Sequence, residues 1–247
     1  MANILYLMPG AGTSHEERQR RERIANTFLT NPTHKVVVDT VGKGVKSIEC
    51  SIDGDVSIHG LLKKALTERD HFDALIVGCA DDPGLFSLRE LLDVPVVGPL
   101  ESSIAFSFML GDRFTLMTTS EDSVPESRMI LRKYGVLDKC ASVRYMDFLV
   151  LDMMTGKTTR EEVLGRFLNE VDLARKDGAT SVVMGCMTMA FLLLDEDANQ
   201  VSSVPVINPA KIAIKTAEMM ISLGMRHSDA AYPKPDYERV KQSILQD

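Results

Sequence analysis

The stretch Asp73-Ala-Leu-Ile-Val-Gly-Cys79 decides the fold, because the chain repeats its pattern as Thr180-Ser-Val-Val-Met-Gly-Cys186. Each copy is a short apolar run that ends in Gly-Cys and leads into a helix-like segment. A Val-Pro-Val run and a further proline follow in both places, over residues 94–99 and 204–209, and then a helix that ends in Leu-Gly. Because the whole order of elements recurs, the sequence predicts two similar lobes related by a pseudo-two-fold axis.

Short apolar runs alternate with longer, periodic ones along the chain. Short runs with β-branched side chains are typical of strands buried on both faces of a parallel sheet, and their alternation with helices implies right-handed crossovers. We expect an α/β fold of two pseudo-symmetric lobes, each a mainly parallel sheet flanked by helices. The expected strands are Ile4–Met8, Lys35–Thr40, Ala74–Gly78, Val94–Gly98, Phe114–Met117, Ser181–Met184 and Val204–Ile207. The expected helices are His15–Leu29, Ser57–Glu68, Leu85–Leu91, Ser102–Leu110, Val124–Tyr134, Thr159–Lys176 and Ala210–Leu223. The expected long connections are Val41–Val56 and Tyr145–Thr158.

The repeat also divides the chain. We expect a first lobe of residues 1–98, completed by 208–247, and a second lobe of residues 99–207. The helix after Pro209 should return to the first lobe, just as the helix after Pro99 leaves it. Ligands of parallel sheets bind beyond the carboxyl ends of the strands, so we expect the active site in a cleft between the lobes.

Composition excludes several function classes. With 28 basic and 35 acidic residues the net charge is −7, which gives no electrostatic reason to bind nucleic acid. The basic cluster Arg18–Arg23 is expected to be a solvated helix face. The start lacks the features of a signal peptide and no apolar run is long enough to cross a membrane, so we expect a cytoplasmic protein. Four cysteines without Cys-x-x-Cys or Cys/His clustering predict neither disulfides nor a metal site.

Two cysteines at matching strand ends favour racemisation as the reaction. A racemase removes a proton from one face of a carbon and returns one to the other face, which two acid/base groups do better than one. Cysteine serves in both roles near neutral pH when its pKa is lowered somewhat. Cys79 and Cys186 are therefore the candidate pair, whereas Cys50 and Cys140 have no matching partner and are expected to be structural. The alternative for all four is that of small buried hydrophobic side chains.

The residues after each cysteine suggest how an anion could be stabilised there. Asp82 fits a helix N-cap and Pro83 the first helical position, which would place Cys79 near a helix N-terminus. After Cys186, Thr188 is a candidate cap of an apolar helical run. Backbone N–H groups at such positions favour a thiolate and could hold an oxygen on which enolate charge develops.

These residues give the chain a clear resemblance to a known superfamily. It resembles the aspartate/glutamate/hydantoin racemases, and within them the hydantoin and allantoin racemase branch. The resemblance covers nearly the whole chain. The segments that carry it are Ser47-Ile48-Glu49, Gly78-Cys79-Ala80-Asp81-Asp82-Pro83-Gly84-Leu85, Thr118-Thr119 with Val124-Pro125, Cys140–Arg144, Gly185-Cys186, and Leu223–Ser228 with Tyr232 and Pro235.

The resemblance implies a two-lobed α/β fold, no cofactor, and a homo-oligomer that acts on a small-molecule substrate. It implies that Cys79 and Cys186 are the opposed acid/base pair and that Thr118 and Thr119 line the substrate site, with backbone donors after each cysteine. The substrate would be a hydantoin-like or amino-acid-derived small molecule. The complete set of candidate substrate contacts is Pro9, Thr13, Ala80, Asp81, Thr118, Thr119, Met187 and Thr188.

Some segments depart from the pattern of the branch. After the first strand the branch has Asn-Pro-Asn with Ser or Thr, and this chain has Met8–Ser14 without those amides. Met187-Thr188-Met189 replaces Ala-Gly-Met after the second cysteine, Asn208 stands where the branch often has Asp, and Asp81 adds a carboxylate beside Cys79. These departures affect the pocket more than the chemistry, and they leave the exact substrate open.

Three other functions remain open on sequence alone. A cis-trans isomerase of a small dicarboxylic acid that uses a covalent cysteine adduct would retain both thiols. A decarboxylase of such an acid would need only one of them. A non-catalytic protein whose two lobes close on a small ligand would need neither, and removal of one thiol would leave its affinity unchanged.

Overall fold

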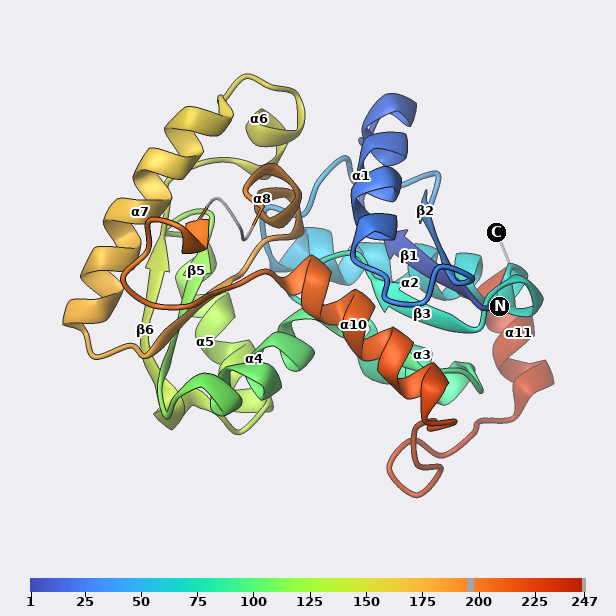
Figure 1. Ribbon diagram of the computed structural model, residues 1–247. Coiled ribbons are helices and arrows are strands. Elements are labelled where there is room, and N and C mark those ends of the chain that lie inside the picture. The colour runs from blue at the N-terminus through green and yellow to red at the C-terminus, as the bar shows by residue number, and fades with distance from the viewer. Residues whose placement is uncertain (195–197, 246–247) are drawn as a thin grey trace. The chain divides into compact units, whose positions relative to one another are not determined.

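The computed structural model describes residues 1–194 and 198–245, which group into two compact units. The first unit comprises Met1–Ile48, Ile52–Gly98 and the chain from Ala213 onward, and the second comprises Glu49–Ser51 and Pro99–Ile212. Each unit has its own four-stranded parallel sheet flanked by helices (Figure 1), so the expected α/β fold is confirmed. The last unit boundary lies within a helix, at residues 212/213.

In the first unit the strand order is β2-β1-β3-β4. The core on one side of the sheet joins alternate residues of β1 and β3, such as Leu5, Leu7, Leu75 and Val77, to apolar side chains of α2, α3 and α11. On α1, Ala25 is fully buried, and this helix packs along β2. The elements of the unit are β1 (Asn3–Met8), α1 (His15–Thr27), β2 (Lys35–Thr40), α2 (Ser51–Thr67), η1 (Arg69–His71), β3 (Ala74–Val77), α3 (Leu85–Leu91), β4 (Val96–Val97), most of α10 (Pro209–Ser222) and α11 (Tyr237–Leu245).

In the second unit the strand order is β6-β5-β7-β8. Phe114 and Leu116 of β5 and Val183 of β7 form a core with α4 and α5, while α7 contacts β6 and β7. Helix α7 begins with a complete capping box between Thr159 and Glu162, which fixes its first turn. The elements are α4 (Pro99–Leu110), β5 (Phe114–Thr118), α5 (Ser123–Lys133), η2 (Leu137–Lys139), β6 (Cys140–Tyr145), α6 (Val150–Met154), α7 (Arg160–Lys176), β7 (Ser181–Met184), α8 (Met187–Leu192) and β8 (Val206–Ile207).

The two sheets repeat one another down to individual hydrogen bonds. The N–H of Leu75 donates to the carbonyl of Pro95 at 2.9 Å, and the N–H of Val182 donates to that of Pro205 at the same distance. At the start of the strands, Asp73 N–H donates to Asn3 O at 2.7 Å and Thr180 N–H to Arg113 O at 2.8 Å. The repeat seen in the sequence is therefore a repeat of backbone geometry.

Most predicted elements are confirmed, with three differences. Helix α2 begins at Ser51, so the expected connection Val41–Val56 is shorter than predicted. Residues 53–55 of this expected connection, Asp-Gly-Asp, lie inside the helix, where Asp53 in the first turn is favourable for the helix dipole. Strand β6 was not predicted, because every one of its residues is only half-buried and its apolar pattern is weak. Helix α11 was not predicted either. The expected connection Tyr145–Thr158 contains the short helix α6.

Along residues 1–194 and 198–245, none of the helices is both long and apolar enough to cross a membrane. The same described residues contain no group of three or more His, Cys, Asp or Glu side chains placed to hold a metal ion.

Candidate functional site

Cys79 leaves the first sheet at the carboxyl end of its inner strand β3. The preceding Gly78 donates its N–H to the carbonyl of Leu7 at 2.7 Å. A Cβ on Gly78 would lie 2.8 Å from both that oxygen and the Cα of Met8, so only glycine permits this approach of β3 to β1. The close contact fixes the point at which the half-buried Cys79 side chain begins.

The thiol of Cys79 has a carboxylate beside it. Its Sγ donates to Oδ2 of Asp81 at 3.6 Å, a normal length for a hydrogen bond from sulfur. An ionised carboxylate can accept this hydrogen only from the protonated thiol. The contact therefore belongs to the state in which Cys79 carries a proton to give.

The prediction that Asp82 caps a helix beginning at Pro83 is wrong. Helix α3 begins at Leu85, its N-cap is Gly84 in the left-handed region (φ 68°), and Asp82 itself has a φ of 51°. Proline disfavours the α conformation in the residue before it, so the chain makes a turn from Cys79 to Gly84 before the helix starts. Asp82 is buried, and its carboxylate packs against Gly98, where a Cβ would lie 2.6 Å from Oδ2.

Cys186 has the matching position in the second unit. Gly185 donates its N–H to the carbonyl of Met117 at 2.7 Å, and a Cβ on Gly185 would lie 2.9 Å from that oxygen. Cys186 itself is the N-cap residue of α8, with extended backbone angles, so the prediction that Thr188 caps this helix is wrong. Since each strand ends with the same glycine contact, the two cysteines emerge at equivalent points of the two sheets.

The other candidate residues gather at the same two sheet edges. In the first unit, β1 and β3 are neighbours in the register Leu7↔Val77, so the residues after each strand share one edge. In the second unit, β5 and β7 are neighbours in the register Met117↔Met184. The first edge carries Pro9, Thr13, Cys79, Ala80 and Asp81, and the second carries Thr118, Thr119, Cys186, Met187 and Thr188.

Main-chain hydrogen bonds hold the loop that follows β1. Its backbone is held by the loop of residues 45–46, through N–H groups of Ala11 (2.8 Å) and Gly12 (3.0 Å). A Cβ on Gly12 would lie 2.5 Å from the carbonyl oxygen of Lys46, so the loop has no room for a side chain at this position. The buried Thr13 places its Oγ1 at 3.8 Å from the sulfur of Met8.

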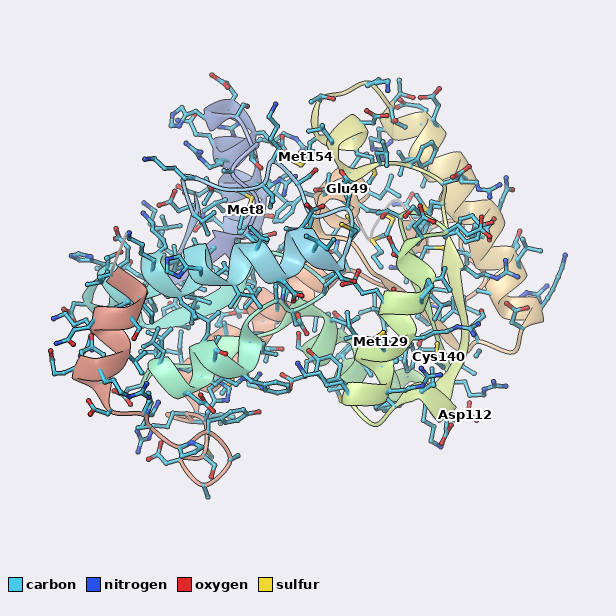
Figure 2. The ribbon with its side chains drawn as sticks, turned by 180° about the vertical axis from the view of Figure 1, so that it is seen from behind. Met8, Glu49, Asp112, Met129, Cys140 and Met154 are labelled. Atoms are coloured by element: carbon cyan, nitrogen blue, oxygen red, sulfur yellow. The ribbon has the colours of Figure 1, made fainter. Side chains whose placement is uncertain are left out.

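Arg21 is a residue near this edge that sequence reasoning missed. The expectation that Arg18–Arg23 is a solvated face is wrong for Arg21, which is only 2% exposed. Its guanidinium lies 3.6 Å from the sulfur of Met8, which Figure 2 labels, and its Nε donates to Glu17 at 2.9 Å. The four-residue spacing to the buried Ala25 was the signal that Arg21 lies on the inner face of α1.

The side chains of Glu49 and Asn208 make hydrogen bonds to backbone groups of helices in the second unit. The carboxylate of Glu49, labelled in Figure 2, accepts the N–H groups of Val150 (3.0 Å) and Leu151 (2.9 Å) at the start of α6. The buried Asn208 accepts the N–H of Ala210 at 3.0 Å and donates its amide to the carbonyl of Ala190 in α8 at 2.8 Å. The Asn208 side chain therefore links the start of α10 to the helix that follows Cys186.

Cys140 lies outside both edges. Its thiol donates to the carbonyl of Ser142 at 3.1 Å within β6 (Figure 2). Burial raises the pKa of the Cys140 thiol, against the smaller opposing effect of backbone hydrogen bonds. These properties agree with the expected structural role, because a raised pKa disfavours the reactive thiolate.

Comparison with known proteins shows which family the chain belongs to. The family model of Asp/Glu/hydantoin racemases matches residues 4–217. The chain is 32% identical to the hydantoin racemase of Rhizobium meliloti over 193 residues, which covers 76% of this chain and 78% of that protein. It is 30% identical to the hydantoin racemase of Paenarthrobacter aurescens over 199 residues, covering 78% and 81%.

Solved structures agree with the sequence comparison. The allantoin racemase of Klebsiella pneumoniae superposes with a TM-score of 0.84 and 26% identity, over 96% of this chain and 94% of that one. The resemblance inferred from the cysteine motifs is thus confirmed, and so is the class of enzyme. The chain belongs to the Asp/Glu/hydantoin racemase family, in its hydantoin and allantoin racemase branch, and is an isomerase of the racemase type.

Proposed function

We propose that this racemase inverts the carbon next to the carbonyl of a hydantoin-type ring, such as a 5-substituted hydantoin or allantoin, with Cys79 and Cys186 as its two bases. The observation that carries the proposal is the matched origin of the two thiols. Each follows a glycine whose N–H donates at 2.7 Å to the neighbouring strand. The names of the relatives support the substrate class.

The proposed reaction exchanges one proton on each side of the carbon. One cysteine, as thiolate, removes the proton from C5 of the ring, and the electron pair moves onto the adjacent carbonyl as an enolate. The other cysteine, as thiol, gives its proton to the opposite face of C5. The product has inverted configuration, and the two sulfurs have exchanged protonation states, so the reverse reaction uses the same groups in opposite roles.

Asp81 assigns a starting role to each thiol in this scheme. Its hydrogen bond at 3.6 Å requires the protonated form of Cys79, which makes Cys79 the acid and Cys186 the base in the first direction. Thr118 and Thr119, buried at the end of β5, and the backbone N–H groups after each cysteine would donate to the ring oxygens as charge develops.

The test is isotope exchange by single-cysteine variants in D₂O, with each enantiomer of a 5-substituted hydantoin and of allantoin. We expect the wild type to lose optical rotation and its α-proton NMR signal together. Cys79→Ala and Cys186→Ala should each abolish racemisation, yet each should exchange the α-proton of one enantiomer only, a different one in each variant. Cys50→Ala and Cys140→Ala are matched controls and should keep both activities.

Other results would overturn the proposal. If either single variant still racemised, one base would suffice and the two-thiol mechanism would be wrong. If no ring substrate exchanged its proton while aspartate, maleate or an arylmalonate was consumed, the proposed substrate class would be wrong. The homo-oligomer and the cytoplasmic location expected from the sequence also remain predictions, of which light scattering of the purified protein tests the first.

A further inference from the structure

The edge strand β4 is held on its outer side by two side chains. The N–H of Val96 donates to Nε2 of His227 at 2.8 Å, and the carbonyl of Val96 accepts from Nε of Arg89 at 3.1 Å. Among the residues that the structure describes, no strand pairs with this side of β4, where the sheet order ends. The two side chains therefore occupy the hydrogen-bonding groups that an adjacent strand would use.

Two other edge strands are held in the same way by asparagine. In β8, the equivalent residue Val206 donates to Oδ1 of Asn199 at 2.9 Å and accepts from its amide at 3.1 Å. In β2, Val36 makes the same two contacts with Asn26, at 3.0 and 2.9 Å. An amide presents a donor and an acceptor at every pH. In β4 the acceptor is instead an imidazole nitrogen, which accepts only while it is unprotonated.

His227 belongs to the C-terminal segment that carries the Leu-Gly-Met-Arg-His-Ser motif, which the proposed reaction does not use. Its ring and that of Tyr232 form a T-shaped pair with a centroid distance of 5.6 Å, and the Tyr232 hydroxyl accepts from Arg89 at 2.9 Å. The charged and titratable groups around this corner come from the segment itself and from α3 with its following turn. They include Tyr232, Arg226, Asp229 and Lys234 on the segment, and Arg89 and Asp93 on the other side.

Strand β4 supports the loop that carries Cys79. It pairs with β3 through Leu75↔Val96 and Ile76↔Val97. The residue after it, Gly98, lies against that loop, where a Cβ would come within 2.6 Å of both the Asp82 carboxylate and the Leu85 side chain. A shift of β4 would therefore move the surface on which the Cys79–Gly84 turn rests.

We propose that His227 is a positioning residue for the Cys79 loop, which it holds through Val96 and β4 only while its Nε2 is unprotonated. The role of Cys79 in this inference rests on the proposed function. The hydrogen bond between Val96 and His227 does not depend on that function. Acid should loosen β4 and leave β8 unchanged, because Asn199 does not titrate. The Cys79 thiol would then lose its alignment, whereas Cys186 would keep its own. This loss would occur as the pH falls through the range where histidine gains a proton, near 6.5.

The test is amide hydrogen exchange of the wild type, His227→Gln and His227→Ala at pH 7.5 and 5.5, corrected for the intrinsic rate. We expect wild-type protection over residues 94–98 to fall about fivefold at the lower pH, the effect of one lost hydrogen bond. His227→Gln supplies an acceptor that does not titrate and should keep its protection at both values. His227→Ala should show the lowered protection at both pH values, and residues 204–208 should not respond in any variant.

Two further readouts connect the contact to Cys79. The alkylation rate of Cys79 by iodoacetamide, relative to that of Cys186 in the same sample, should depend on pH differently in the wild type and in His227→Gln. The acid limb of kcat/KM should shift to lower pH in His227→Gln. Equal hydrogen exchange of the wild type and His227→Gln at both pH values would overturn the proposal. So would an exchange effect without any change at Cys79. If exchange and alkylation behave as expected but no ring substrate is racemised, the proposed function fails and the positioning of the loop stands.

Discussion

The backbone N–H of Gly78 donates to the carbonyl oxygen of Leu7 at 2.7 Å, with no room between the strands for a Cβ. Gly185 and Met117 have the same relationship in the second unit. A glycine is thus required directly before each candidate catalytic cysteine, because it brings the end of the strand against its neighbour. The Gly-Cys pair is one structural unit, in which glycine sets the backbone position from which the thiol projects.

Substituting this glycine should damage both stability and activity. Gly78→Ala forces a methyl group to within 2.8 Å of backbone atoms that cannot rotate away, and overpacking of this kind costs about 1–3 kcal/mol. We expect a lower midpoint of urea unfolding and a loss of racemisation larger than the loss of folded protein explains. Gly165→Ala is the matched control, since a Cβ there meets nothing within 4 Å and the residue lies inside α7. It should stabilise the protein by about 0.5–1 kcal/mol. Equal stability of the two variants would show that the strands can separate to accept the methyl group.

The sequence was sufficient for the features that local chemistry determines. The two apolar runs that end in Gly-Cys and the two strands at the Val-Pro-Val runs were predictable because each depends on neighbouring residues. Strand β6 was not, because an edge strand that is half-buried throughout has no clear apolar alternation. The burial of Arg21 and the hydrogen bond from Val96 to His227 depend on packing between segments that are distant in the sequence. Val96 and His227 are 131 residues apart. The turn at Asp82 was misread because a cap and a left-handed turn share the same residues, Asp, Pro and Gly.

Asn208 should tolerate aspartate poorly. Aspartate could keep the cap of α10 by accepting the N–H of Ala210, but it cannot donate to the carbonyl of Ala190, which the amide does at 2.8 Å. The buried carbonyl would then face a carboxylate oxygen, and an unsatisfied buried group costs about 1–3 kcal/mol. We expect Asn208→Asp to have a lower unfolding free energy than the wild type at pH 7, and this difference should shrink as falling pH protonates the new carboxyl group, because a protonated carboxyl can donate to the carbonyl of Ala190. A difference from the wild type that stays the same between pH 7 and pH 3.5 would contradict this account of the contact.

Glu218 should make the stability of the first unit depend on acid pH. Burial raises the pKa of this carboxyl. The N–H groups of Asn31 and Thr30, together with Lys215, lower it by more than burial raises it, so the pKa lies below its usual value. A lowered native pKa means that the contribution is fully present above the unfolded pKa of 4.5 and is lost as the pH falls through the native value. The unfolding free energy of the wild type should therefore exceed that of Glu218→Gln above about pH 5, and the difference should shrink below 4.5. Urea titrations at pH 7, 5, 4 and 3.5 would measure it, and a difference that stays constant would contradict the assignment.

Asp81 should control the reactivity of Cys79 without touching that of Cys186. In Asp81→Asn a neutral amide replaces the carboxylate that repels a thiolate on the Cys79 sulfur 3.6 Å away. The repulsion energy between two unit charges at about this distance is roughly 1 kcal/mol even in water. We expect Cys79 to react with iodoacetamide about fivefold faster than in the wild type at pH 7, with Cys186 unchanged as the internal reference. The same variant should lower kcat for the enantiomer with which Cys79 acts as the acid, because a Cys79 that holds its proton less firmly is less often protonated at the start of that reaction. The test is the ratio of the Cys79 and Cys186 alkylation rates, measured on the two cysteine peptides by mass spectrometry. A ratio unchanged from the wild type would mean that the carboxylate faces solvent and has no part in the proton transfer.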